Sequence, residues 1–166
     1  MRTNRVVMVL TALAVAGAAA CAPTFSPEAM NRVDRTVSFR QLQASPDAFL
    51  GKWVLAGGII LETRNSRDGT AIEVLERPVD RNGRPFETDE SGGRFIIQSD
   101  QFLDPADFHQ GKRISLVGEV AGQEVRPLGE MHYRYPVLTA KELRLWEPRS
   151  SPQVSFGFGI GVGHHF

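Results

Sequence analysis

The apolar residues between positions 112 and 121 alternate with polar ones, and this limits what the chain can fold into. Ile114, Leu116 and Val120 fall on one side of an extended segment, whereas Arg113 falls on the other. A period of two residues is that of a β-strand with one buried face. The pattern therefore predicts a strand whose apolar side faces a core.

A second strand is predicted over residues 53–61, where both faces are apolar. Such a strand is covered on both sides or bends sharply, and a bend or bulge is expected at Gly57 and Gly58. Turn residues follow at 67–69 and 80–83. Further strands are expected at 71–75 with Ile72 and Val74 inward, at 94–98 with Phe95 and Ile97 on one side, and at 133–146.

Helix is expected only in short turns. One lies on each side of Ser45-Pro46-Asp47, and another begins at Asp104, which is better explained as an N-cap than as a catalytic acid. Five or six short strands with so little helix predict a mainly β domain, a small OB-like β-barrel, over residues 37–147. Residues 21–36 contain two prolines and no clear period, so we expect a tether there.

The first twenty residues are predicted to be an export signal. Arg2 and Arg5 precede an uncharged, largely apolar run over residues 6–20, which ends in three alanines. A basic start, an apolar centre and a small-residue end are typical of a secretory signal peptide. The run is shorter than the ~20 apolar residues of a membrane-spanning helix.

Cys21, the only cysteine, follows these alanines directly. The arrangement resembles the bacterial lipobox, in which the thiol accepts diacylglycerol, although Ala18 stands where leucine is usual. An acylated Cys21 would anchor the protein in outer-membrane lipid without spanning it. Ala22, in place of an aspartate, implies the outer membrane with the domain facing the periplasm. The alternative is a soluble exported protein with a free thiol.

A series of short motifs then occurs in one order over residues 37–147. They are Gly51-Lys52-Trp53-Val54, Gly57-Gly58-Ile59-Ile60, Leu75-Glu76-Arg77-Pro78-Val79-Asp80, Gly83-Arg84-Pro85, Gly93-Arg94-Phe95, Phe102-Leu103-Asp104-Pro105, Val117-Gly118-Glu119-Val120, Gly129-Glu130, Tyr135-Pro136-Val137 and Leu145-Trp146. Together they resemble the Slp family of outer-membrane lipoproteins, the starvation-inducible group of Gram-negative bacteria. The resemblance implies a lipid-anchored protein induced in stationary phase, with no established activity.

Charge and motif content argue against several functions. The 19 basic and 19 acidic residues give a net charge of zero, and cleavage after residue 20 would leave 17 basic residues, so nucleic-acid binding is not expected. No nucleophile elbow, phosphate loop or dinucleotide motif is present. The four histidines lack metal-ligand spacing, and only the adjacent His164 and His165 suggest even a weak site. We therefore expect no enzyme activity, cofactor or metal.

A ligand groove is the alternative to a purely structural envelope role. Arg84, Arg94 and Arg113 could meet Tyr133 and Tyr135 on one face of the barrel, since small β-barrels bind oligomeric ligands with such residues. A periplasmic location would favour a glycan or another envelope ligand. The competing interpretation is that these arginines simply occupy the solvated face of their strands.

The tail, residues 148–166, alternates glycine with phenylalanine and aliphatic residues. This resembles the last strand of an outer-membrane barrel, but one strand cannot close a barrel. Three interpretations stay open: a disordered end, an added strand, or a segment that pairs with a partner or a second copy.

Overall fold

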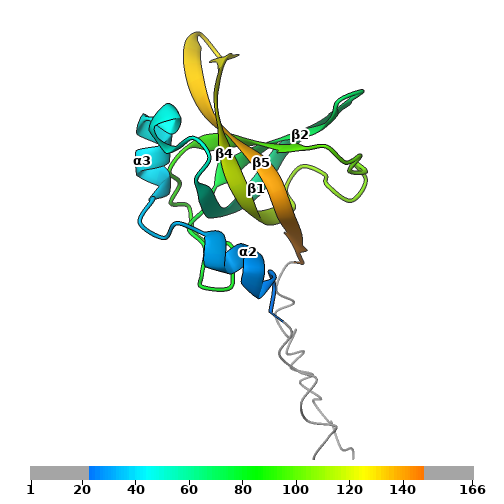
Figure 1. Cartoon of the computed structure of the whole chain (residues 1–166). Helices are drawn as coiled ribbons and strands as arrows, with labels where there is room; N and C mark the ends of the chain where they lie inside the picture. Colours follow the sequence, from blue (N-terminus) through cyan, green and yellow to red (C-terminus); the bar gives the residue numbers. More distant parts are fainter. Residues whose placement is uncertain (1–22, 148–166) are drawn as a thin grey trace, which may run out of the picture.

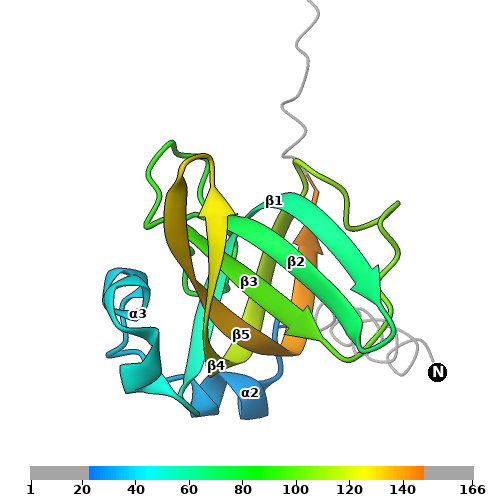
Figure 2. The ribbon, with the colours of Figure 1, turned by 90° about the horizontal axis from the view of Figure 1, so that it is seen from above.

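The computed structural model describes residues 23–147, so the predicted signal peptide, Cys21 and the tail lie outside the described residues. Five strands form a closed barrel in the order β1-β2-β3-β5-β4 (Figures 1 and 2). Their bounds are β1 Trp53–Ser66, β2 Gly69–Glu76, β3 Arg94–Ser99, β4 Arg113–Leu128 and β5 Met131–Trp146. The predicted mainly β, OB-like barrel is confirmed.

Every neighbouring pair of strands is antiparallel except β3 and β5, which run parallel. Ile96, Ile97 and Gln98 of β3 lie opposite residues 137–139 of β5. This pair closes the barrel, because β5 also pairs with β4 along most of its length. Each strand thus has two partners, and closure removes the exposed sheet edges that favour aggregation.

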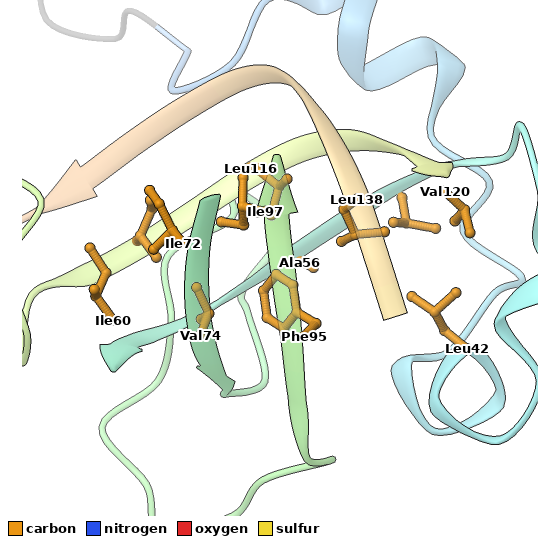
Figure 3. Close-up of a cluster of buried hydrophobic side chains, with 12 residues drawn as sticks. Leu42, Ala56, Ile60, Ile72, Val74, Phe95, Ile97, Leu116, Val120 and Leu138 are labelled. Atoms are coloured by element: carbon orange, nitrogen blue, oxygen red, sulfur yellow. The ribbon is translucent and has the colours of Figure 1, made fainter. Parts of the chain in front are cut away.

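The barrel interior is filled by the inward residues that the alternation predicted. Ile72 and Val74 of β2 are fully buried, as are Phe95 and Ile97 of β3. Figure 3 shows these side chains meeting Ile60, Leu116 and Leu138 from the other strands. Branched aliphatic side chains and one aromatic ring therefore supply most of the hydrophobic stabilisation of the interior.

The strand β1 is covered on both faces, as its composition predicted. Val54, Ala56 and Ile60 point into the barrel, whereas Trp53 and Leu55 pack outside it against Phe25 and Ala29. The outer cover is supplied by α2 (Pro27–Arg32) and the residues just before it. In Figure 1, α2 lies against the barrel at the side where the described chain begins.

This packing differs from the predicted tether of residues 21–36. Ser26 caps α2, and its amide and hydroxyl both donate to the Glu142 carboxylate of β5. Phe25 is only 2% exposed and contacts the buried Val117. A six-residue helix shows too little of a period to be detected in a sequence, and its stability here comes from tertiary contacts. Within the described residues, the folded domain therefore begins at about Phe25.

The two glycines of β1 do not form the predicted bulge. The register of β1 shifts between Ile60 and Glu62, not at Gly57 or Gly58. A Cβ on Gly58 would collide with the backbone carbonyl of Leu75 on β2. Glycine is thus needed because two strands approach each other too closely there for any side chain.

Two short helices close one end of the barrel. They are α3 (Phe39–Ala44), which begins with a capping box between Ser38 and Gln41, and η2 (Pro46–Phe49). They confirm the predicted helical turns on both sides of Ser45. Leu42 of α3 is 1% exposed and lies beside Val120 and Leu138 at the end of the core (Figure 3).

The third predicted helical turn is a single turn. The Ala106 amide donates to the Asp104 carboxylate and the Phe108 amide to the Asp104 carbonyl, so Asp104 does cap it. Leu103 and Phe108 pack against the core beyond this turn. Because the Thr63 hydroxyl donates to the Phe108 carbonyl, this loop is fixed to β1.

The hairpin of β4 and β5 extends well beyond its predicted length. Residues 122–128 of β4 pair only with residues 131–137 of β5, around a turn at Gly129, which has a φ of 61°. Val125 and Met131 are exposed there, at 56% and 69%. The sequence did not indicate this extension because neither of its faces is consistently apolar.

Leu42→Ala tests whether α3 is part of the core. The substitution should lower the free energy of unfolding by about 2 to 5 kcal/mol, as is usual for a buried leucine. Leu50→Ala is the matched control, because Leu50 is 57% exposed and should change stability by less than about 1 kcal/mol. Urea denaturation of both variants measures the difference, and equal losses would show that α3 is not part of the core.

Candidate functional site

Three of the predicted ligand residues meet beside β3. The Arg94 guanidinium lies 2.8 Å from the Glu73 carboxylate, and the Arg94 amide donates to the Tyr133 hydroxyl at 2.9 Å. The rings of Tyr133 and Tyr135 pack edge to face at 4.8 Å, and the Tyr135 hydroxyl lies 3.4 Å from Glu73. Each polar group in this cluster already has a partner within it.

The electrostatics of the cluster are also balanced. The Glu73 carboxylate raises the pKa of Arg94 above its ordinary value by accepting its hydrogen bond. Burial and the same carboxylate raise the pKa of the Tyr135 phenol, which therefore stays protonated. Tyr135 is 2% exposed, and its ring is buried in a separate cluster with Ile96 and Val137. The arrangement is that of a self-contained structural cluster.

The other two predicted ligand residues lie on a different part of the barrel. Arg113 of β4 pairs with Glu87 at 2.6 Å, and Arg84 stacks over the Trp146 ring at 5.1 Å. Both guanidinium groups also donate to the Glu147 carbonyl at 3.3 Å. The shared carbonyl brings Arg84 and Arg113 side by side.

The five residues therefore do not form the single groove that was predicted. Arg94 lies on β3 and Arg113 on β4. The register leads from Arg94 across β2 and β1 to Arg113, and on the other side of the closed barrel β5 lies between the two strands. Along that register the two arginines are three spacings of ~4.8 Å apart, and they pair with different carboxylates, Arg94 with Glu73 and Arg113 with Glu87. The sequence showed which residues face outward but not the strand order around the barrel.

A hollow of about 530 Å³ lies next to Arg113 and includes residues that the sequence did not single out. Its walls are Ile59, Arg77, Phe86, Glu87, Thr88, Asp89, Gly111 and Arg113. The size falls within the ~300 to 1,000 Å³ typical of small-ligand sites. Phe86 is 53% exposed, so the hollow offers an aromatic side chain to solvent.

Arg77 is the most unusual residue that lines this hollow. It is 9% exposed, and its guanidinium donates to the carbonyls of Asp89 and Glu90 at 3.1 and 3.0 Å. Within residues 23–147 no carboxylate lies within 4.0 Å of it, and its buried Nε has no hydrogen-bond partner. The buried Arg77 charge is therefore held by two backbone carbonyls and by the field of the nearby Glu76 carboxylate, without a direct ion pair.

Among residues 23–147 no group of three metal-binding side chains is close enough to hold an ion. His164 and His165 lie outside the described residues. None of the helices within 23–147 has the length and apolar character needed to cross a membrane.

Comparison with known proteins places this barrel among its relatives. The model of the outer membrane lipoprotein Slp family matches residues 18–159, which is most of the chain. The chain belongs to the Slp family. Its predicted resemblance to this family is therefore confirmed, and the protein is an outer-membrane protein of the cell envelope.

Individual relatives agree with this assignment. An uncharacterized protein of Haemophilus influenzae is 33% identical over 110 residues, 66% of this chain and 60% of the relative. The uncharacterized lipoprotein YeaY of Escherichia coli is 26% identical over 106 residues, which cover 64% of this chain and 54% of YeaY. The outer membrane protein Slp of Escherichia coli is 20% identical over 135 residues, which cover 80% of this chain and 71% of that protein. The chain thus matches less than two thirds of the length of the first two relatives.

One solved structure, a mitochondrial single-stranded DNA-binding protein from S. cerevisiae, is also similar. It is 13% identical and covers 57% of this chain and 94% of its own, but its TM-score of 0.31 is too low to support any conclusion.

Glu76, next to Arg77, supplies a pH-dependent test of the site's burial. Burial raises the pKa of its carboxyl, although the Gly92 amide donates to it and Arg77 opposes the shift. A raised folded pKa stabilises the fold below the unfolded pKa, and this stability is lost as pH rises through the folded pKa. Glu76→Gln stays neutral throughout. The wild type should therefore lose stability relative to Glu76→Gln as the pH rises above about 4, the ordinary range of a glutamate carboxyl, in urea denaturation, and a difference independent of pH would contradict the assignment.

Proposed function

We propose that this protein is a non-catalytic envelope domain held on the periplasmic side of the outer membrane by acylation of Cys21. The observation that carries the proposal is the position of Cys21: it directly follows the predicted export signal and precedes Phe25, the first buried residue within 23–147, by four residues. Its acyl chains would contribute ~0.8 kcal/mol per buried CH₂.

The absence of catalysis is supported by the side-chain contacts of residues 23–147. A serine meets a carboxylate at Ser26 and Glu142, but there the carboxylate accepts from a capping residue. The one histidine hydrogen bond in this part of the chain joins His109 to the neighbouring Gln110 carbonyl. A nucleophile, a base and an orienting group, which covalent catalysis needs together, do not meet there.

Cys21→Ala tests the anchor. Cells fed an alkyne fatty acid should label the wild-type protein, and the variant should carry no label because it lacks the accepting thiol. Click chemistry to a fluorophore after immunoprecipitation measures the label. A wild type without label would contradict the anchoring proposal, whereas a labelled variant would place the acyl chain on another residue.

The proposed physiological role is maintenance of the envelope in stationary phase or under stress, which rests on the resemblance to the Slp family. A deletion strain should become more sensitive to detergent in stationary phase than in exponential phase. Wild-type protein should restore resistance and Cys21→Ala should not. Equal sensitivity in both phases would contradict a starvation-linked role.

A second candidate function is binding of an acidic envelope glycan in the hollow beside Arg77. The buried Arg77, which has no carboxylate within 4.0 Å among residues 23–147, favours it, as do the exposed Phe86 ring and the Arg84 and Arg113 pair, two of the residues first proposed for a ligand face. Arg94, Tyr133 and Tyr135 would then support the barrel.

Phe86→Ala tests this binding with little risk to the fold, because the ring is 53% exposed. Retention on immobilised peptidoglycan or acidic polysaccharide should weaken about tenfold, equivalent to about 1.4 kcal/mol. Phe102→Ala is the matched control, since Phe102 is 72% exposed and lies outside the walls of the hollow. Equal retention of both variants would exclude the hollow as the glycan site.

A further inference from the structure

The packed domain begins very close to Cys21. Phe25 is buried, and the Thr24 carbonyl accepts a hydrogen bond from the Arg144 guanidinium at 2.6 Å. Three to four residues span at most about 14 Å even when fully extended. If Cys21 is acylated, as proposed above, this side of the barrel therefore lies at the level of the lipid headgroups.

A hollow of about 240 Å³ opens on this side, between α2, β1 and β5. It is lined by Ser26, Glu28, Ala29, Arg32, Trp53, Lys141 and Glu142. Ligand sites for drug-sized molecules run from ~300 to 1,000 Å³, so this one suits a headgroup and not a long polymer.

Two cations in the hollow share one aromatic ring. The Arg32 guanidinium lies 3.6 Å from the centre of the Trp53 ring, and the Lys141 ammonium lies 5.6 Å from it. Stacking on a tryptophan restricts the guanidinium to a plane without using its N–H donors. Arg32 therefore presents its donors in a fixed orientation.

The charges of the hollow are complementary to those of a zwitterion. Among residues 23–147 no carboxylate lies within 4.0 Å of Arg32, whereas Lys141 pairs with Glu119 at 3.1 Å. Of the two lining carboxylates, Glu142 is already bound by Ser26 and Glu28 is exposed on the first turn of α2. One available cation thus lies near one exposed carboxylate.

We propose that this hollow, the Trp53 pocket, binds the headgroup of a zwitterionic aminophospholipid. Arg32 binds the phosphate with two N–H donors, the geometry in which guanidinium and phosphate interact most strongly, and Lys141 adds positive charge. The ammonium of the headgroup lies toward Glu28. The proposal depends on the anchor at Cys21 for its location but not for its chemistry.

The test titrates full-length protein, purified from membranes in a phosphate-free detergent, with glycerophosphoethanolamine, the deacylated headgroup. Trp146→Phe leaves Trp53 as the only tryptophan of two, so its fluorescence reports on the pocket. The signal should change saturably. Arg32→Gln should weaken the response at least tenfold, and Arg40→Gln, an exposed arginine on α3, should leave it unchanged.

Each other result overturns part of the proposal. No saturable change in fluorescence, or equal affinity of Arg32→Gln and Arg40→Gln for the headgroup, would contradict binding in the Trp53 pocket. Equal affinity for glycerophosphoglycerol would remove the role of Glu28, and equal affinity for inorganic phosphate would indicate a simple anion site. Fatty-acid labelling of the same variants separates the two proposals: labelled protein without headgroup binding contradicts only the pocket, and unlabelled protein with headgroup binding contradicts only the anchor.

Discussion

The parallel contact between β3 and β5 holds the rest of the barrel together. Only three residue pairs form it, yet without it both strands would become open sheet edges. Ile97 and Leu138, which lie opposite each other in this pair, are both fully buried in the core. The contact that closes the barrel therefore also buries these two side chains in the core. Because β4 separates the two strands in sequence, closure depends on contacts between residues about forty positions apart.

The fold could be predicted wherever one local signal decided the outcome. The period of two residues identified β2 and β3 through Ile72, Val74, Phe95 and Ile97, because each strand has one strongly apolar face. The outer end of the β4–β5 hairpin was missed because its backbone pairing, and not an apolar face, extends it. The helix α2 was missed because Phe25 is stabilised by Val117, a contact that no local pattern encodes.

The candidate sites were harder to predict, since they depend on register and loop conformation. Alternation predicted that Arg113 faces outward from its strand, whereas Arg84 lies in a loop, and the Glu147 carbonyl that both contact brings them together. Arg77 follows a strand of ordinary pattern, and its burial arises from the loop that contributes the carbonyls of Asp89 and Glu90. A side chain's neighbours across the barrel are set by strand order, which alternation alone does not determine.

The hydrogen bonds that fix the start of the domain have a mechanical consequence. All three end on β5: the Arg144 guanidinium donates to the Thr24 carbonyl, and the Ser26 amide and hydroxyl donate to the Glu142 carboxylate. A force applied from the N-terminal side of the chain is therefore transmitted directly to β5, and it does not act on α2 alone. As β5 also pairs with β3 and β4, that load is distributed over the whole wall of the barrel, and the domain resists extraction as one unit.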